Sequence, residues 1–310
     1  MNTFVIVPNK KHYFFSEINQ ENIFIEEEPF LTETNKFLSL LQRILKKINW
    51  GQCYNLFLKK WKANLLICKN CIIFDQAFSP SIVKYIHTIN PHLNIYIYLW
   101  NPIFKNYKII KKLNSVKSFT HVYSFDKNDC KKYGFSFSPM IYNFDSPKVE
   151  KNFNKYDVIF VGYLKNRGMW LTNIYNHLEK QKTRNFFYVQ SNQITEILPF
   201  KLHKKYLDYQ VYLENMLSSK AVLDIVQNGQ IGLTIRSLEA LCYEKKLITN
   251  NQDILTYNFY NKNNIFILGI DDINTLITFI NTPFVKIDKE IIRQYNFVDW
   301  IQSFSTLKGN

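Results

Sequence analysis

Residues 213–250 read LENMLSSKAVLDIVQNGQIGLTIRSLEALCYEKKLITN, and this stretch decides the fold class. The spacing of its apolar residues predicts a helix, a buried strand at 221–226, a turn, a second helix and another strand at 247–249. The turn at 227–232 contains two glycines, and polar residues stand where the strands end. Alternating helices and strands are typical of parallel α/β sheets, which bind ligands outside the carboxyl ends of their strands.

The same alternation extends along the rest of the chain. We expect strands at 4–7, 65–67, 72–74, 95–100, 122–125, 157–161, 186–189 and 265–268, and helices at 34–48, 80–90, 127–133, 168–181, 207–218, 271–281 and 288–304. Residues 144–156 are polar and aperiodic and contain Pro147, which is typical of a linker. The sequence therefore predicts an α/β protein with two Rossmann-like domains, 1–150 and 151–310, that face a cleft. The final helix is expected to be able to pack back on the first domain.

The composition fits a folded globular protein, with 46% hydrophobic and 21% charged residues. The net charge of +14 is concentrated in residues 34–132, which hold 17 Lys and Arg but only three acidic residues. A basic face of this size can bind nucleic acid or an anionic membrane surface, or it can simply be a soluble basic surface.

The sequence also indicates a compartment. No run of 18 apolar residues occurs, and the apolar part of the N-terminus is too short for a signal peptide. The five cysteines form no disulfide framework, and the Cys68–Cys71 pair has no second pair or histidine cluster to complete a zinc site. We therefore expect a cytoplasmic protein, with the inner face of the cytoplasmic membrane as one place for it.

Two segments carry cations at predicted strand ends. The sequence GYLKNRG, 162–168, leaves a strand at Gly162 and brings Lys165 and Arg167 to its end, where they can contact a phosphate. It matches neither the dinucleotide fingerprint nor the Walker loop, and it can also be read as a solvated basic turn. Lys220 precedes the strand at 221–226 and is either a phosphate contact or a partner for a helix C-terminus.

The segment that follows the glycine-containing turn predicts an anion site. Backbone amides near Gly232, Leu233 and Thr234 open a helix, and Thr234 and Arg236 add hydrogen-bond donors. Glu239 lies about two helical turns further on, where a carboxylate can accept hydrogen bonds from sugar hydroxyls. The alternative role for Glu239 is to stabilise the helix dipole.

These residues bear a family resemblance. The sequence from Ser218 to Asn251, with DVIFVGYLKNR at 157–167, resembles the C-terminal domain of bacterial GT-B glycosyltransferases of lipopolysaccharide and capsule synthesis. Residues 122–143 resemble the end of the N-terminal domain of such enzymes, so the resemblance spans about 120–260.

The resemblance implies a nucleotide-sugar donor site. It implies that Gly162 and Arg167 face the donor phosphates, that Lys220 contacts a phosphate, that residues 232–236 hold the donor and that Glu239 binds the ribose. Many retaining members of the family carry a second glutamate eight positions earlier, where this chain has Ile231. The choice between inverting and retaining chemistry therefore stays open.

Transfer with inversion also requires a base for the acceptor hydroxyl. Asp75 is our first candidate because it follows the apolar residues 72–74 at the carboxyl end of a predicted strand, and His12 is the second. Asp75 can also be read as an N-cap or loop residue. The resemblance implies no bound metal or other cofactor, and the sequence contains no D-x-D motif.

The predicted partners are a nucleotide-sugar donor, a glycan or glycolipid acceptor and an anionic membrane surface, with no nucleic acid. The residues expected at the membrane are Trp50, Trp61, Lys46, Lys47, Lys59, Lys60 and Lys62. The rival hypotheses are a basic nucleic-acid-binding α/β protein and a sugar-phosphate-binding α/β protein without transferase activity. The sequence identifies neither the donor sugar, the acceptor and linkage, nor the oligomeric state.

Overall fold

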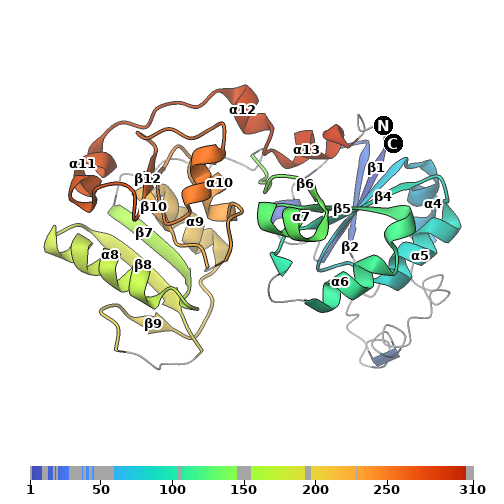
Figure 1. Ribbon diagram of the computed structural model, residues 1–310, viewed down its shortest axis with the longest axis horizontal. Coiled ribbons are helices and arrows are strands. Elements are labelled where there is room, and N and C mark those ends of the chain that lie inside the picture. Colours follow the sequence, from blue (N-terminus) through green and yellow to red (C-terminus); the bar gives the residue numbers. More distant parts are fainter. Residues whose placement is uncertain are drawn as a thin grey trace. The chain divides into compact units, whose positions relative to one another are not determined.

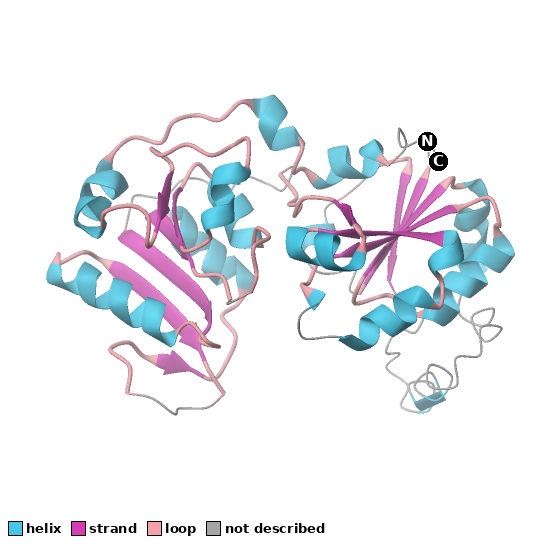
Figure 2. Cartoon of the chain, viewed as in Figure 1, coloured by secondary structure: helices cyan, strands magenta, loops and turns pink. Residues whose placement is uncertain are grey.

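The chain folds into two compact α/β units in the computed structural model (Figure 1 and Figure 2). The model describes residues 2–8, 13–16, 18, 20–27, 37, 40–41, 44, 59–103, 107–144, 155–192, 197–227 and 229–304. The first unit contains Met1–Pro139 and Phe297–Asn310, and the second contains Met140–Asn296. The chain thus enters the second unit before the predicted boundary at 150, and the last helix belongs to the first unit. Most of the predicted linker, 145–154, lies outside the described residues.

The first unit is built on a six-stranded parallel sheet. Its strands, in spatial order, are β2 (Ile23–Glu27), β1 (Thr3–Val7), β3 (Asn70–Phe74), β4 (Asn94–Leu99), β5 (Thr120–Ser124) and β6 (Ser136–Phe137). The central strands β1 and β3 are buried along their whole lengths, which explains their continuous apolar sequence. The strand order reverses between β1 and β3, and ligands bind at such a switch point.

Helices cover both faces of this sheet. They are α1 (Tyr13–Ser16), α4 (Lys59–Ile67), α5 (Pro80–Ile89), α6 (Tyr107–Asn114), η3 (Lys117–Phe119), α7 (Lys127–Tyr133) and α13 (Phe297–Ser303). Leu65, Ile82 and Leu113 of α4, α5 and α6 share one core cluster with the sheet. On the other face, Phe14 of α1 meets Phe297 of α13 edge to face at 5.3 Å.

Two helices begin where their sequences predict. Ser79 accepts a hydrogen bond from the backbone of Ile82 at the start of α5, and Pro80 occupies the first helical position. Asp126 caps α7 in the same way, and Gly134 ends that helix with a φ of 72°. The helices predicted at 80–90 and 127–133 are therefore confirmed.

The second unit is built on another six-stranded parallel sheet. Its strands, in spatial order, are β12 (Ile265–Ile267), β11 (Lys246–Thr249), β10 (Ser219–Asp224), β7 (Tyr156–Tyr163), β8 (Asn185–Gln190) and β9 (Leu202–His203). Counted along the chain, this is the 3-2-1-4-5-6 order of dinucleotide-binding folds, and it reverses between β7 and β10. We therefore look for a ligand site at the carboxyl ends of these two strands.

Helices lie on both faces of the second sheet as well. They are α8 (Gly168–Lys180), α9 (Tyr209–Leu217), α10 (Ile235–Cys242), η4 (Gln252–Thr256), η5 (Ile273–Thr275), α11 (Leu276–Asn281) and α12 (Lys289–Arg293). Leu171 of α8 and Leu276 of α11 share a core cluster with Phe160 and Leu223 of the sheet. Figure 1 shows α8 lying along β8. The fold class predicted for each half, a Rossmann-like α/β layer structure, is confirmed.

Some predicted elements are wrong. Residues 65–67 form the last turn of α4 instead of a strand, because Leu65 faces the core cluster while Leu66 and Ile67 are exposed. The helix predicted at 288–304 is two helices, α12 and α13, which belong to different units. The helix predicted at 34–48 lies mostly outside the described residues, and β2, β6, β9 and α6 were not predicted.

Candidate functional site

A cavity of about 240 Å³ opens at the carboxyl ends of β7 and β8 in the second unit. Its walls are mostly polar and aromatic, and they are formed by Val161, Gly162, Tyr163, Lys165, Arg167, Tyr188, Gln190, Tyr206, Leu207 and Arg236. Three of the predicted cationic residues therefore line one cavity beside the switch point of the sheet, together with Gly162.

Arg236 is held in place by a buried carboxylate at the end of β10. Asp224 has no exposed surface, and its Oδ1 accepts a hydrogen bond from Arg236 Nη1 at 3.2 Å. Its Oδ2 accepts hydrogen bonds from Thr234 Oγ1 at 2.5 Å and Ser237 Oγ at 2.9 Å. Because Thr234 also caps α10, the helix start, the strand end and the Arg236 guanidinium form one rigid group.

Gly162 allows this guanidinium to lie against β7. A Cβ at position 162 would stand 2.7 Å from Arg236 Nη2, closer than real contacts permit. The guanidinium carbon also lies 5.8 Å from the centroid of the Phe160 ring, within reach of a cation–π contact. The glycine is therefore needed so that the side chain of Arg236 can approach β7 closely. The sequence had suggested a different reason, a close turn of the backbone at the strand end.

Arg167, the second arginine, is buried without a full set of partners. The residue is the N-cap of α8, which its side chain does not cap. Only 6% of the residue is exposed, and Nε has no hydrogen-bond partner among the described residues. Nη1 makes one long bond, 3.5 Å, to the carbonyl of Tyr163. Burial and, to a lesser extent, the charge of Arg236 lower the pKa of Arg167 to about 10, while Asp224 opposes the change. We call Arg167 and Arg236 the arginine pair.

Aromatic residues form the rest of the cavity wall. The rings of Tyr163 and Tyr206 meet edge to face at 5.4 Å, and Tyr206 is 74% exposed. Lys165 adopts a left-handed φ of 42° and places Nζ 5.7 Å from the Tyr163 ring centroid. Gln190 is buried, and its amide donates to the carbonyl of Lys204. The cavity thus combines cations at one end of β7 with exposed aromatic surface.

The described part of the loop that contains Gly232 lies behind the cavity wall and does not line the cavity itself. Gly232 and Leu233 are buried and are not among the described residues that line the cavity. Asn251 Nδ2 donates to the carbonyl of Ile231 at 3.1 Å and so ties the loop to the end of β11. From this segment, the structure brings Arg236 to the cavity and leaves Gly232, Leu233 and Thr234 in supporting positions.

Glu239 is fully engaged by tyrosine hydroxyls. The residue is 1% exposed, its Oε1 accepts a bond from Tyr209 at 3.0 Å, and its Oε2 accepts one from Tyr212 at 2.6 Å. Tyr142 joins the network through a 3.0 Å contact with the Tyr209 hydroxyl. Burial raises the pKa of Glu239, while the two tyrosines and Arg236 oppose that rise. A ribose can reach this carboxylate only if Tyr209 releases it.

Lys220 does not join the arginine pair. It is the second residue of β10, whereas Asp224 is the last, so the two are separated by about 13 Å of extended strand. Lys220 Nζ forms an ion pair with Asp157 at 2.9 Å and donates to Asn281 Oδ1 at 2.7 Å. Lys220 therefore lies at the amino ends of the parallel strands, which we call the amino edge of the sheet. The expected phosphate contact would need it at the opposite side, the carboxyl edge, where the strands end.

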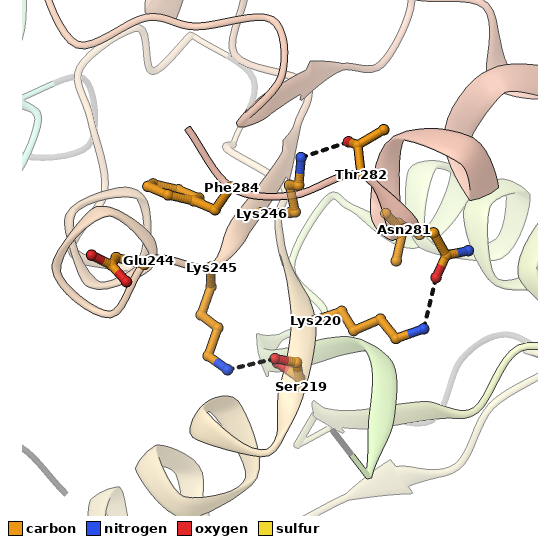
Figure 3. Close-up of a pocket in the computed structure, with 9 residues that line it drawn as sticks. Ser219, Lys220, Glu244, Lys245, Lys246, Asn281, Thr282 and Phe284 are labelled. Carbon is orange, nitrogen blue, oxygen red and sulfur yellow. Dashed lines mark hydrogen bonds between the residues drawn. The ribbon is translucent and has the colours of Figure 1, made fainter. Parts of the chain in front are cut away.

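Lys220 lines a second cavity of about 240 Å³ at this amino edge, with Lys245 and Lys246 (Figure 3). Lys245 Nζ donates to the carbonyls of Leu217 and Ser219 at 2.6 and 2.7 Å. Lys246 Nζ donates to Asn263, Thr282 and Pro283. The carbonyl at 217 belongs to the end of α9, so these lysines satisfy acceptors at a helix C-terminus and the turns beside it.

In the first unit, Asp75 lies directly after β3 at the switch point of the sheet. Its Oδ2 accepts bonds from the backbone and side-chain nitrogens of Asn101 at 3.1 and 3.0 Å, and its Oδ1 accepts one from the backbone of Gln76 at 2.8 Å. Burial raises the pKa of Asp75 to about 6, and these hydrogen bonds oppose the rise. The position agrees with the predicted strand end, and His12 lies outside the described residues.

Sequence reasoning missed the residues that organise the site. Asp224 was included in a predicted strand without a role, although a carboxylate at the end of a buried strand needs a cationic or hydroxyl partner. Tyr163, Tyr188 and Tyr206 carried no sequence signal, because their convergence depends on the pairing of β7, β8 and β9. Among the described residues, no group of three or more His, Cys, Asp or Glu side chains is arranged to hold a metal ion.

No family model matches the sequence, and no curated protein matches it either. Solved structures share the fold. A lipopolysaccharide outer core galactosyltransferase, WaaB in its apo form, is similar over 99% of this chain and 98% of its own, with 14% identity and a TM-score of 0.50.

Two further solved structures, a glycosyltransferase and TarM, share the architecture. One from Rickettsia africae is similar over 99% of this chain and 97% of its own, with 12% identity and a TM-score of 0.55. A mutant of S. aureus TarM, in a complex that contains UDP, is similar over 81% of this chain and 57% of its own, with 9% identity and a TM-score of 0.50. The chain therefore has the GT-B fold of these enzymes, as the sequence resemblance implied.

Proposed function

We propose that this protein is a glycosyltransferase that binds a nucleotide-sugar donor at the arginine pair of the second unit. The observation that carries the proposal is Arg167, a buried guanidinium whose Nε has no partner among the described residues. An arginine is costly to desolvate unless its donors are used, and a phosphate supplies the acceptors that this one lacks. The GT-B fold supports the same reading, because its relatives named above are glycosyltransferases.

The arginine pair suits the leaving group of such a reaction. Glycosyl transfer breaks the bond between the anomeric carbon and a phosphate oxygen, and the bonding electron pair leaves with the nucleotide. Cations placed at that oxygen in advance stabilise the charge as it develops. Asp224 keeps Arg236 in place, and Lys165 lines the same cavity. We propose that these three cations, Arg167, Arg236 and Lys165, hold the donor phosphates.

Glu239 is proposed as the ribose contact in the donor-bound state. Its Oε1 already accepts a hydroxyl donor, Tyr209, at a distance of 3.0 Å. A ribose hydroxyl presents the same chemistry as this phenol, so it can replace Tyr209 at the carboxylate without leaving the buried oxygen unsatisfied. Tyr212 keeps its own bond to Oε2 and holds the side chain in place.

Asp75 is proposed as the base for the acceptor hydroxyl. A carboxylate whose pKa lies near 6 is ionised at neutral pH and is still a better proton acceptor than an ordinary aspartate. In the step, the acceptor oxygen forms a bond to the anomeric carbon, its proton passes to Asp75, and the nucleotide leaves. His12 remains the second candidate for the same role.

The acceptor is proposed to be a glycan or glycolipid of the cell surface, reached at an anionic membrane. The support is the exposed basic surface of the first unit, which contains Lys108, Lys111, Lys112, Lys117, Lys131 and Lys132. Asp126 and Asp129 in the same stretch of sequence are buried, so the exposed side chains there are mainly lysines. No helix of the described residues is long and apolar enough to cross a bilayer.

Trp61, one of the residues expected at the membrane, lies in the core of the first unit. Trp61 is 7% exposed and packs edge to face on Phe4 at 5.3 Å, so it belongs to the core. Trp50, Lys46 and Lys47 lie outside the described residues. Flotation with neutral and anionic liposomes tests the remaining basic surface: we expect binding only to anionic vesicles and release by salt. Binding that is independent of lipid charge contradicts the membrane proposal.

The transferase proposal is tested by nucleotide release. The protein is incubated with a panel of UDP-, GDP-, dTDP- and CMP-linked sugars, and the liberated nucleotide is measured with and without an extract of surface glycolipids. We expect release from one donor class, stimulated by the extract and lost in Arg167→Met. A protein that neither binds nor cleaves any donor of the panel contradicts the proposed function.

A further inference from the structure

The carboxylate of Asp75 is held asymmetrically. Its Oδ2 accepts two hydrogen bonds, from the backbone nitrogen and from Nδ2 of Asn101, at 3.1 and 3.0 Å. Its Oδ1 accepts one bond among the described residues, from the backbone of Gln76 at 2.8 Å. A carboxylate oxygen offers about two lone-pair sites, so the described residues use both sites of Oδ2 and leave one of Oδ1 open.

We propose that Asn101 is a positioning residue for the transfer reaction: it occupies Oδ2 of Asp75 and so assigns the proton of the acceptor hydroxyl to Oδ1. The proposal deepens the proposed function and rests on Asp75 being the base. Asn101 follows β4, the neighbour of β3, so the contact joins the carboxyl ends of two adjacent strands. The base is thereby fixed relative to the sheet instead of depending on one flexible loop.

The placement of Asn101 favours this role over a purely structural one. The residue is exposed, and its amide spans 26 positions of sequence to reach Asp75. Packing does not explain its side chain, because the core beneath the strand ends is formed by aromatic residues such as Phe74 and Trp100, whose rings meet at 5.2 Å. An exposed amide that makes a second bond to an already bonded oxygen orients that oxygen.

Among the described residues, no charged side chain contributes to the shift in the pKa of Asp75. Burial raises the pKa of Asp75, and hydrogen bonds from the neutral amides of Asn101 and Gln76 lower it. The elements packed at these strand ends present neutral rings: Phe15 of α1 lies 5.4 Å from Phe74, and Phe297 of α13 lies 6.4 Å from it. Among the described side chains of β3, β4, α1 and α13, the other titratable groups are Cys71, Tyr96, Tyr98, whose hydroxyl donates to the carbonyl of Pro139, and Asp299.

The test combines NMR titration of the carboxyl carbon of Asp75 with a pH–rate profile. Full-length protein with 13C-labelled aspartate is titrated as wild type, Asn101→Ala and Gln76→Ala, and Asp75→Asn assigns the signal. Gln76→Ala is the matched control, since Gln76 donates to Asp75 through its backbone and its exposed side chain is not involved. The rate of transfer, as kcat/KM, is then followed from pH 5 to pH 9 in the same variants.

We expect Asn101→Ala to raise the Asp75 midpoint by roughly one pH unit, because a bond to the charged form is lost. The acid limb of kcat/KM should move by the same amount, which lowers the rate about fivefold at pH 6 and little at pH 9. Gln76→Ala should leave the titration curve and the rate profile unchanged. Asn101→Ser keeps a side-chain donor, so its Asp75 midpoint should lie between those of the wild type and Asn101→Ala.

Other results overturn the inference in distinguishable ways. An Asp75 midpoint that stays in place in Asn101→Ala shows that Asn101 does not hold the carboxylate. A midpoint that moves while the rate profile does not shows that Asp75 is not the base, although donor binding at the arginine pair can still stand. If wild-type protein transfers no sugar from any donor, the proposed function fails, and the NMR arm still decides whether Asn101 controls Asp75.

Discussion

The two edges of the second sheet both carry buried or half-buried cations, but they use them differently. At the amino edge, Lys220, Lys245 and Lys246 each donate to protein oxygens (Figure 3). The carbonyl of Leu217 at the end of α9 is a further acceptor, from Lys245. At the carboxyl edge, Arg167 has one long hydrogen bond and a buried nitrogen that finds no partner in the part of the chain that the structure describes. Cavities of similar volume, about 240 Å³, lie at both edges.

The difference shows that a cavity lined by cations is not by itself a ligand site. Lys245 and Lys246 at the amino edge stabilise the fold, because they satisfy backbone carbonyls that would otherwise be buried without these donors. The arginine at the carboxyl edge leaves donor capacity unused, and the Rossmann strand order places it at the switch point where ligands bind. Four substitutions can break or sharpen this contrast.

Arg167→Met should have the largest effect. It removes charge-assisted bonds to the donor phosphates, so the Kd for a nucleoside diphosphate should rise about 100-fold, corresponding to roughly 3 kcal/mol. Stability should not fall, because a desolvated charge is removed together with its few bonds. Calorimetric titration with UDP and GDP measures the first and chemical denaturation the second.

The matched control for this variant is Arg184→Met. Arg184 belongs to the same unit, but it pairs with Asp157 at the amino edge of the sheet and its side chain is 60% exposed. We expect no change in nucleotide affinity. If the control weakens binding as much as Arg167→Met does, general loss of positive charge explains both results and the assigned site is wrong.

Lys245→Met should show the opposite profile. Removing its ammonium leaves the carbonyls of Leu217 and Ser219 buried without that donor, so the free energy of unfolding should fall by about 2 kcal/mol. The affinity for UDP or GDP should stay unchanged. A variant with normal stability and weakened nucleotide binding reverses the contrast between the two edges.

Gly162→Ala should have an intermediate effect on binding. The new methyl group meets Arg236 Nη2 at 2.7 Å and must displace the guanidinium from β7. The φ of Gly162 is not left-handed, so the backbone accepts alanine and the fold should persist. We expect nucleotide affinity to fall about tenfold, roughly 1.4 kcal/mol, with unchanged circular dichroism. Unaltered affinity indicates that Arg236 does not touch the nucleotide.

Tyr209→Phe should have the smallest effect, and in the opposite direction. The variant removes the hydroxyl that competes for Glu239 Oε1, so a nucleotide with a ribose should bind about threefold more tightly. Tyr212→Phe is the control, since its partner Oε2 is not the oxygen proposed for ribose. Weaker binding in Tyr209→Phe contradicts the ribose role of Glu239.

The local features of the fold could be predicted from the sequence. Ser79 with Pro80, and Asp126 with Gly134, mark helix ends through side-chain and backbone chemistry that acts over a few residues. The helix at 59–67 was read as a strand at its end because three apolar residues in a row fit both periods. The strand order, on which the position of the proposed ligand site depends, results from pairing between distant segments of the chain. It could therefore not be predicted from local sequence patterns.

The candidate site was predictable to the extent that it follows strand ends. Gly162, Arg167 and Arg236 stand after or beside the carboxyl ends of β7 and β10, and the parallel sheet brings them together. Lys220 was expected as a phosphate contact too, but it lies at the amino end of β10, so in a parallel sheet it stands at the edge opposite to the arginine pair. Lys220 has its hydrogen-bond partners within the protein, whereas Arg167 lacks one for Nε among the described residues. This difference depends on contacts between distant segments, so the spacing of residues in the sequence could not predict it.

The central claim is that the arginine pair holds the phosphates of a nucleotide. Calorimetric titration of the wild-type protein with a diphosphate, a monophosphate and a nucleoside of the same base tests it most directly. We predict that affinity falls at least about tenfold with each phosphate removed, because each loses charge-assisted bonds, and that added salt weakens the diphosphate most. A nucleoside that binds as tightly as its diphosphate, at any salt concentration, contradicts the claim.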